Sequence, residues 1–399
     1  MKNCFFLLIF VLTSLFANAQ SEVQNDFAQY KIFTSLDEAL NKPAEVYRLH
    51  LSKQNLTELP AEIGSLTNLL ELDLSNNALT SLPAEIGNLK NLKVLLLNHN
   101  ELTGLPASVG QLVSLNTFSL NNNKLISLPE SFGNLTNLIK LDLYFNNLRK
   151  LPESVSQLKN LRVIDLYVND LEKLPKNIGN LDSLTDLYVG SNRLTKLPES
   201  LGLLTNLRVL DLGDNQLSGL PESISNLVAL EYLFLFENKI SQLPDQIGNL
   251  IHLSELDLNG NQLSDLPESI SKCSSLSELN LDLNLFTEFP AEILLLENLI
   301  SLGLSFNQIA ELPQNINLLK NLEALTLDDN PVTAFPESFW NLTNLVYLDI
   351  SGTLLTAVPV KISYLTRLQE LDISDLQLTS EQLESFKKYL VNPDVQVRY

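Results

Sequence analysis

Hydrophobic residues recur along the chain with a period of 23 positions, from Val46 to Leu378, without insertion or deletion. The repeat that starts at Leu138 begins LIKLDLYFNNL, which is apolar at positions 1, 4, 6 and 11 and has asparagine at position 9. Apolar side chains at positions 4 and 6 enclose one that faces the other way, which predicts a short strand. Fifteen units in register predict a solenoid, in which each unit buries its apolar face against its neighbours.

Two further columns of the repeat support this prediction. A buried amide must be hydrogen-bonded and offers both a donor and an acceptor, so the asparagine at position 9 is expected to bridge the turns of adjacent coils. Fourteen of the 17 prolines share one register, from Pro60 to Pro359, and proline ends strand pairing because it lacks an N–H. The asparagine column fills twelve successive repeats: Asn77, Asn100, Asn123, Asn146, Asn169, Asn192, Asn215, Asn238, Asn261, Asn284, Asn307 and Asn330.

The pattern LxxLxLxxNxL followed by LPxxIxxLxxL resembles the leucine-rich-repeat family in its 23-residue class, over residues 46–378. Similar repeats occur in Ras-pathway scaffold, plant disease-resistance-type and bacterial proteins. The resemblance implies an α/β fold: a right-handed solenoid of about 15 coils, with a concave parallel β-sheet and convex irregular or 3-10 segments. It also implies a protein that binds other proteins and is not an enzyme.

The two ends of the chain differ from the repeats. Residues 1–19 have the layout of a signal peptide: Lys2, an apolar run too short to span a bilayer, and an A-x-A cleavage site that ends at Ala19. We therefore expect an exported protein (secreted, periplasmic or on the cell surface) that has no transmembrane segment.

Residues 20–45 are expected to form a short lead-in and a capping helix, and residues 379–399 a C-terminal cap. Each end carries a capping-box pattern, Ser35 with Glu38 and Thr379 with Gln382. Helical caps of this kind cover the otherwise open core of the solenoid at residues 46–378.

Composition excludes several functions. The chain has 26 basic and 47 acidic residues, a formal net charge of −21, which argues against nucleic acid and against anionic membranes as partners. The three histidines lie in distant repeats, and no catalytic or metal-binding motif is present, so neither enzymatic activity nor a cofactor is expected. Cys273 occupies a core register that is leucine in the other repeats, which predicts a buried thiol.

The predicted binding site lies in columns 3, 5 and 7, whose side chains point out of the concave face, with columns 2 and 8 beside them. Large aromatic residues gather there in repeats four to eight, counting the repeat at Leu69 as the first full one, whereas other repeats have small or polar residues. Two adjacent glycines in column 7 predict a notch with aromatic walls. The candidate residues are Tyr144, Tyr167, Tyr188, Gly190, Asp211, Gly213, Tyr232, Phe234 and Phe236.

Several interpretations of these columns remain open. The rings could stack along the ladder and stabilise it without any ligand, although exposed apolar patches and aromatic residues are typical of binding sites. A protein or peptide partner fits best, and a basic one would add cation–π and ionic contacts. The alternatives are a carbohydrate-binding protein, a structural or adhesive envelope protein and, without export, an intracellular scaffold. The aspartate pairs Asp142/Asp165 and Asp349/Asp372 are either solvated or share a cation such as Ca²⁺.

Overall fold

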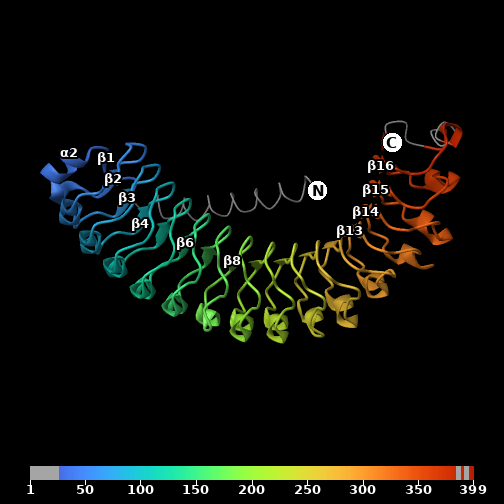
Figure 1. The fold of residues 1–399 in the computed structure, drawn as a ribbon, viewed down its shortest axis with the longest axis horizontal. Coiled ribbons are helices and arrows are strands. Elements are labelled where there is room, and N and C mark those ends of the chain that lie inside the picture. The colour runs from blue at the N-terminus through green and yellow to red at the C-terminus, as the bar shows by residue number, and fades with distance from the viewer. Residues whose placement is uncertain (1–26, 383–387, 391–394) are drawn as a thin grey trace. The chain divides into compact units, whose positions relative to one another are not determined.

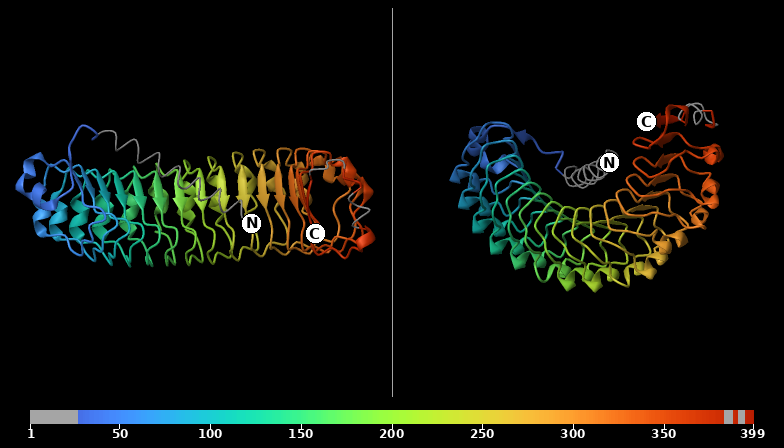
Figure 2. Two further views of the ribbon diagram at one scale, coloured as in Figure 1. Left: turned by 90° about the horizontal axis from the view of Figure 1, so that it is seen from above. Right: turned by 45° about the vertical axis from the view of Figure 1, so that its right-hand side comes forward.

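The computed structural model describes residues 27–382, 388–390 and 395–399. The predicted signal peptide therefore lies outside the described residues. The chain divides into two compact units, a first unit up to Arg193 and a second unit from Leu194. In each unit the strands lie along one side of the coils and the 3-10 segments along the other (Figure 1 and Figure 2).

Short strands stack in parallel within each unit. Within the repeats each strand pairs with residues 23 positions further along, as Asp142 does with Asp165, whereas the terminal strands β1 and β17 pair at other spacings. The strands of the first unit are β1 Ile32–Phe33, β2 Arg48–His50, β3 Glu71–Asp73, β4 Val94–Leu96, β5 Thr117–Ser119, β6 Lys140–Asp142, β7 Val163–Asp165 and β8 Asp186–Tyr188. Those of the second unit are β9 Val209–Asp211, β10 Tyr232–Phe234, β11 Glu255–Asp257, β12 Glu278–Asn280, β13 Ser301–Gly303, β14 Ala324–Thr326, β15 Tyr347–Asp349, β16 Glu370–Asp372 and β17 Gln396–Arg398.

The return segments are single 3-10 turns, most of which follow a proline of the repeated column. Pro60, for example, precedes the turn at a φ of −72°, close to the value that its ring imposes. The turns of the first unit are η1 Pro43–Glu45, η2 Ala61–Ser65, η3 Ala84–Asn88, η4 Ala107–Gln111, η5 Glu130–Asn134, η6 Glu153–Gln157 and η7 Ile178–Asn180. Those of the second unit are η8 Glu199–Leu203, η9 Glu222–Asn226, η10 Ile247–Asn249, η11 Glu268–Lys272, η12 Ala291–Leu295, η13 Ile316–Leu318, η14 Glu337–Asn341 and η15 Val360–Tyr364.

The asparagine column bridges adjacent coils, as the sequence predicts. Asn261 accepts a hydrogen bond from the backbone N–H of Ile240 at 2.9 Å and donates to the carbonyl oxygens of Leu235 and Leu258. The leucine columns between these bridges are fully buried, and so is Cys273, whose Sγ lies 3.7 Å from the carbonyl oxygen of Ile247. Burial raises the pKa of the Cys273 thiol to about 11, which makes it unreactive at neutral pH.

Position 8 of the repeat adopts a left-handed backbone in all fifteen repeats, with φ between +51° and +66°. Asparagine, aspartate and glycine tolerate this conformation best, and they fill position 8 in seven of the fifteen repeats. The conformation follows from the turn that takes each strand into the asparagine bridge. A large or β-branched side chain at position 8 is therefore held there at a cost in free energy.

Hydrogen bonds of both predicted capping boxes form at the ends of the repeats, although residues 383–387 and 391–394 of the predicted C-terminal cap lie outside the described residues. Helix α2, Leu36–Asn41, begins after Ser35, whose hydroxyl accepts from the backbone N–H of Glu38. At the other end Thr379 and Gln382 bond reciprocally, at 2.7 and 3.2 Å. The lead-in does more than the sequence indicates, because Phe27 is buried against Val94 and Leu96 of β4. None of the helices in the described residues is long and apolar enough to cross a bilayer.

Candidate functional site

The first unit presents an exposed aromatic patch on β6 and β7 and the turns that follow them. The rings of Tyr144 and Tyr167 stack with their centroids 6.2 Å apart, and Phe145 lies against Tyr144 at 6.0 Å. Tyr144 is 37% and Phe145 52% exposed, although both are large and hydrophobic. We call Tyr144, Phe145, Tyr167 and Val168 the tyrosine patch.

Backbone geometry at the tyrosine patch is unfavourable for the residues it carries. Phe145 and Val168 occupy position 8 of their repeats, with φ of +54° and +55°. A β-branched valine is rare in this region because its side chain is crowded by the backbone, and strained residues cluster at functional sites. Asparagine, which is at this position in Asn76 and Asn122, would avoid the cost. Folding alone therefore does not explain the choice of phenylalanine and valine here.

A buried lysine balances the aspartates beside the tyrosine patch. Lys140 of β6 is 5% exposed, and burial lowers the pKa of its ammonium group to about 8 although Asp142 and Asp165 oppose the shift. Asp142 itself accepts from the backbone N–H of Tyr144 and from the side chain of Asn121. The predicted aspartate pair thus has a basic group of its own chain beside it.

Tyr188 and Gly190 also belong to the first unit, but they are not exposed. Tyr188 is only 1% exposed, with its hydroxyl 3.5 Å from Oδ1 of Asp186, and Gly190 is buried. The expectation of an exposed ring at Tyr188 is wrong. Large side chains on strands about 4.8 Å apart shield one another from solvent. A residue in an outward column is therefore not always exposed.

In the second unit the aromatic residues lie on and just after β10. The rings of Tyr232 and Phe234 stack at 6.5 Å, and Phe234 is buried. Phe236 lies over Gly213, because a Cβ on that glycine would overlap Cε1 and Cζ of the phenylalanine ring. Within this unit the gap expected above Gly213 is therefore filled by Phe236. The notch predicted between Gly190 and Gly213 would involve both units and stays a prediction.

Asp211, at the end of β9, is fully buried. Its Oδ1 accepts from the backbone N–H of Gly213 at 3.0 Å, but its Oδ2 has no hydrogen-bond partner among the described residues. Burial raises the pKa of this carboxyl to about 7, against the Gly213 hydrogen bond and with some help from Asp257. An unpaired buried carboxylate oxygen is costly, so Asp211 is a candidate ligand-binding group.

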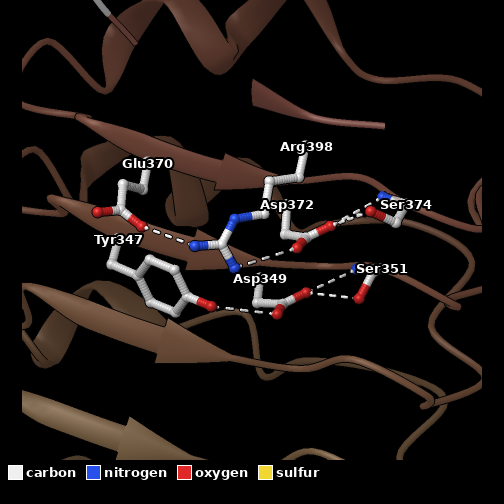
Figure 3. Close-up of polar contacts among 7 residues, drawn as sticks. All are labelled: Tyr347, Asp349, Ser351, Glu370, Asp372, Ser374 and Arg398. Atoms are coloured by element: carbon white, nitrogen blue, oxygen red, sulfur yellow. Dashed lines mark hydrogen bonds and ion pairs between the residues drawn. The ribbon is translucent and has the colours of Figure 1, made fainter. Parts of the chain in front are cut away.

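Three strands share the sequence Glu-Leu-Asp, and two of them bind cations of their own chain. In β3, Glu71 accepts from Arg48 at 2.6 Å and lies 3.0 Å from the ring of His50. In β16, Arg398 of β17 lies 3.4 Å from Glu370 and 3.8 Å from Asp372 (Figure 3). The second aspartate pair, Asp349 and Asp372, thus also has an internal cation beside it.

The third Glu-Leu-Asp strand, β11, has no such partner. No basic side chain in the described part of the chain pairs with Glu255 or Asp257. Burial raises the pKa of Glu255 to about 7, with Glu278 and Asp257 adding to the shift, and that of Asp257 to about 6. We call Asp211, Tyr232, Phe234, Glu255 and Asp257 the acidic site.

Sequence reasoning missed a second strained apolar pair in the second unit. Leu283 and Phe306 occupy position 8 of adjacent repeats, with φ of +54° and +52°, and each is 41% exposed. Position 8 read along the whole array, rather than only in the aromatic repeats, would have revealed them. Among the described residues no group of three or more His, Cys, Asp or Glu side chains could hold a metal ion.

These observations define a repeat solenoid whose outward columns carry the tyrosine patch and the acidic site. Comparison with known proteins gives the family: the model of the leucine-rich repeat region matches residues 46–147, 107–219, 207–304 and 291–390. The chain belongs to the leucine-rich-repeat family, whose members are typically non-enzymatic binding scaffolds. No curated protein matches the sequence.

Solved structures agree with this assignment. A leucine-rich-repeat protein of Leptospira interrogans is 37% identical, with a TM-score of 0.80, over 92% of this chain and all of that one. The plant peptide hormone receptor RGFR1, in complex with RGF2, is 31% identical, with a TM-score of 0.70, over 85% of this chain and 61% of the receptor. An internalin of Listeria monocytogenes is 26% identical, with a TM-score of 0.68, over 78% of this chain and 89% of the internalin.

Proposed function

We propose that the protein is a non-catalytic receptor-like module that binds a protein or peptide on the outward columns of its strands. The observation that carries this proposal is the tyrosine patch, in which Phe145 is exposed and Val168 half-buried, both at left-handed backbone positions. Each such position costs about 1–2 kcal/mol relative to a favoured conformation. A side chain that lowers stability and stays exposed is best explained by contact with a partner.

The chemistry of the patch suits a peptide. Stacked tyrosine rings offer large apolar area with few rotatable bonds and a hydroxyl at the tip, a combination common at binding hot spots. The plant hormone receptor that this chain resembles was solved with its ligand bound, which supports the same kind of partner. A glycan would also stack on Tyr144 and Tyr167, and it is the alternative that the test below separates.

We further infer that the protein is exported, with cleavage after Ala19. The layout of residues 1–19 carries this inference, and the similarity to an internalin is consistent with it. Sequencing the N-terminus of the mature protein tests it, and the expected first residue is Gln20. A mature protein that begins at Met1 would favour an intracellular scaffold.

The binding test compares variants that separate recognition from folding. Peptides selected from a displayed random library on the wild-type protein, and a glycan array, are measured against a Phe145→Asn/Val168→Asn double variant. Because asparagine tolerates the left-handed position, the variant should gain about 1–2 kcal/mol in unfolding free energy and lose tenfold or more in affinity. A purely structural role for the patch predicts lower stability instead.

Tyr144→Ser provides a second variant, and Tyr364→Ser its matched control. Tyr364 is an exposed tyrosine on the 3-10 side of the second unit. We expect peptide affinity to fall with Tyr144→Ser and to stay within twofold with Tyr364→Ser. Failure to select any peptide, or equal affinity in all variants, would overturn the proposal, and dependence on Tyr144 for glycans alone would favour the carbohydrate-binding alternative.

A further inference from the structure

Internal comparison of the three Glu-Leu-Asp strands shows what the unpaired one lacks. Arg398 stands opposite Asp372 in the ladder between β16 and β17, and its guanidinium reaches both carboxylates of β16 (Figure 3). The same ladder position next to β11 is filled by Asn280, which stands opposite Asp257. Asn280 has no positive charge, so the carboxylates of β11 are left without the cation that those of β16 have.

The surroundings of the two strands correspond further. Tyr347 lies beside Glu370 in the ladder between β15 and β16, and Tyr232 lies beside Glu255 in the ladder between β10 and β11. Phe234 lies beside Asp257 and stacks on Tyr232. Rings next to carboxylates suit a guanidinium group, which can form ion pairs at its edge and a cation–π contact on its face.

Asp211 gives evidence that does not depend on the missing cation beside Glu255 and Asp257. It lies in the same column as Asp257, on the other side of Phe234, since β10 pairs with Asp211 on one edge and with Asp257 on the other. Its Oδ2 is completely buried and unpaired. A buried acceptor without a donor beside two unmatched carboxylates points to a donor that the chain does not provide.

We propose that the acidic site binds an arginine side chain of the partner, with Glu255 and Asp257 as its ion-pair acceptors, Asp211 as a further acceptor and Tyr232 and Phe234 as its aromatic wall. This inference rests on the proposed function, because it supplies the chemistry of the peptide bound on the outward columns. The site takes a planar cation with several donors, and Arg398 at β16 is the example within the chain.

The carboxylates of β11 have a backbone donor, the N–H of Asn259, which donates to Oδ1 of Asp257 at 3.0 Å. The carboxyl of Glu237, which follows β10, lies above Gly260, where an added Cβ would be 2.9 Å from its Cδ. Glu278 and Asn280 face the site from β12, and Asp282 beyond them accepts from the backbone N–H of Ser305. Among the described residues, the groups around these carboxylates therefore add negative charge and no positive charge.

The test uses triarginine amide as the probe, with trilysine amide, triglutamate amide and calcium chloride alone for comparison, at low ionic strength. Binding to the full-length protein is measured by titration calorimetry. Glu255→Gln/Asp257→Asn removes the acceptors, and Asn280→Arg places an arginine at the position that corresponds to Arg398. We expect triarginine to bind at least tenfold more weakly to both variants, and the Asn280→Arg variant to unfold at a higher denaturant concentration than the wild type.

Matched controls separate a site from general charge. Glu222→Gln/Glu268→Gln removes two exposed carboxylates of the 3-10 side, and Ser274→Arg adds an arginine there. Both should bind triarginine within twofold of the wild type. Equal losses in the controls and in the acidic-site variants would overturn the proposal, and so would the absence of saturable binding or stoichiometric Ca²⁺ binding that depends on Glu255.

The inference and the proposed function fail in different ways. Library peptides that depend on Tyr144 but lack basic residues, and that bind the Asn280→Arg variant normally, would overturn the arginine site and leave binding on the outward columns intact. Triarginine binding as expected, without any peptide that depends on Tyr144, would support the acidic site and contradict the tyrosine patch.

Discussion

Phe236 packs its ring over Gly213, in the space that a Cβ on that glycine would take. The glycine therefore serves to seat a neighbouring ring rather than to open a gap. This contact lies within the second unit, two residues after Asp211.

Gly213→Ala should displace Phe236. The added methyl group cannot share the space with the ring, and overpacking of this kind costs about 1–3 kcal/mol. We expect a lower denaturant midpoint, measured by circular dichroism. Gly219→Ala is the control, because a Cβ there meets no atom within 4 Å. A Gly213→Ala variant as stable as the wild type would contradict the packing described.

Stability should rise as the pH falls from 8 to 5. The pKa values of Asp211 and Glu255 are raised to about 7 and that of Asp257 to about 6. The folded state therefore holds more protons than the unfolded state between about pH 4 and 7, and it gains stability as they bind. The denaturant midpoint should be higher at pH 5 than at pH 8.

Asp211→Asn should remove part of this pH dependence. The amide is neutral at every pH, so the variant should be more stable than the wild type at pH 8, by about 1–3 kcal/mol, since one pKa unit corresponds to about 1.4 kcal/mol. Asp265→Asn, an exposed aspartate of the same unit, is the control. A larger midpoint at pH 8 than at pH 5 in the wild type would refute the electrostatic description of the acidic site.

Glu71→Gln should destabilise the first unit. Glu71 is buried beneath Arg48 and His50. Burial alone would raise the pKa of its carboxyl, but the hydrogen bonds from His50 and Arg48 outweigh burial and hold the pKa below its ordinary value. Removing one member of a buried pair leaves the other uncompensated, at a cost of about 3 kcal/mol.

The carboxyl of Glu71 also predicts that the first unit loses stability at low pH. A carboxyl with a lowered pKa stabilises the folded state above its unfolded pKa and loses that effect as the pH falls through the folded value. The difference in unfolding free energy between the wild type and Glu71→Gln should therefore be largest at pH 7 and become smaller below about pH 4.5. Glu62→Gln, an exposed glutamate of the same unit, should match the wild type at both pH values in a denaturant titration.

The repeated part of the structure could be predicted from sequence and the outward columns could not. Asn261 and Cys273 occupy registers that recur in most repeats, so their surroundings follow from the period alone. The burial of Tyr188 and Asp211 depends on the size of the side chains beside them. Those side chains lie in columns whose residues differ from repeat to repeat, so the period does not predict them. Position 8 shows in the sequence where large apolar side chains such as Val168 lie, but the left-handed backbone that makes them unfavourable follows from the turn and is seen only in the structure.

Phe27 predicts a further role for the segment before the first repeat. Its ring is buried against Val94 and Leu96, two apolar residues in outward columns of β4, and Lys93 lies 5.7 Å above the ring. Phe27→Ala should expose these residues and cost about 3 kcal/mol, in the range of buried aromatic truncations. Ile32→Ala, at a site 39% exposed, should cost much less. Hydrogen exchange measures the effect directly: faster exchange confined to amides of residues 93–97 is expected, and unchanged exchange there would show that Phe27 does not hold this surface.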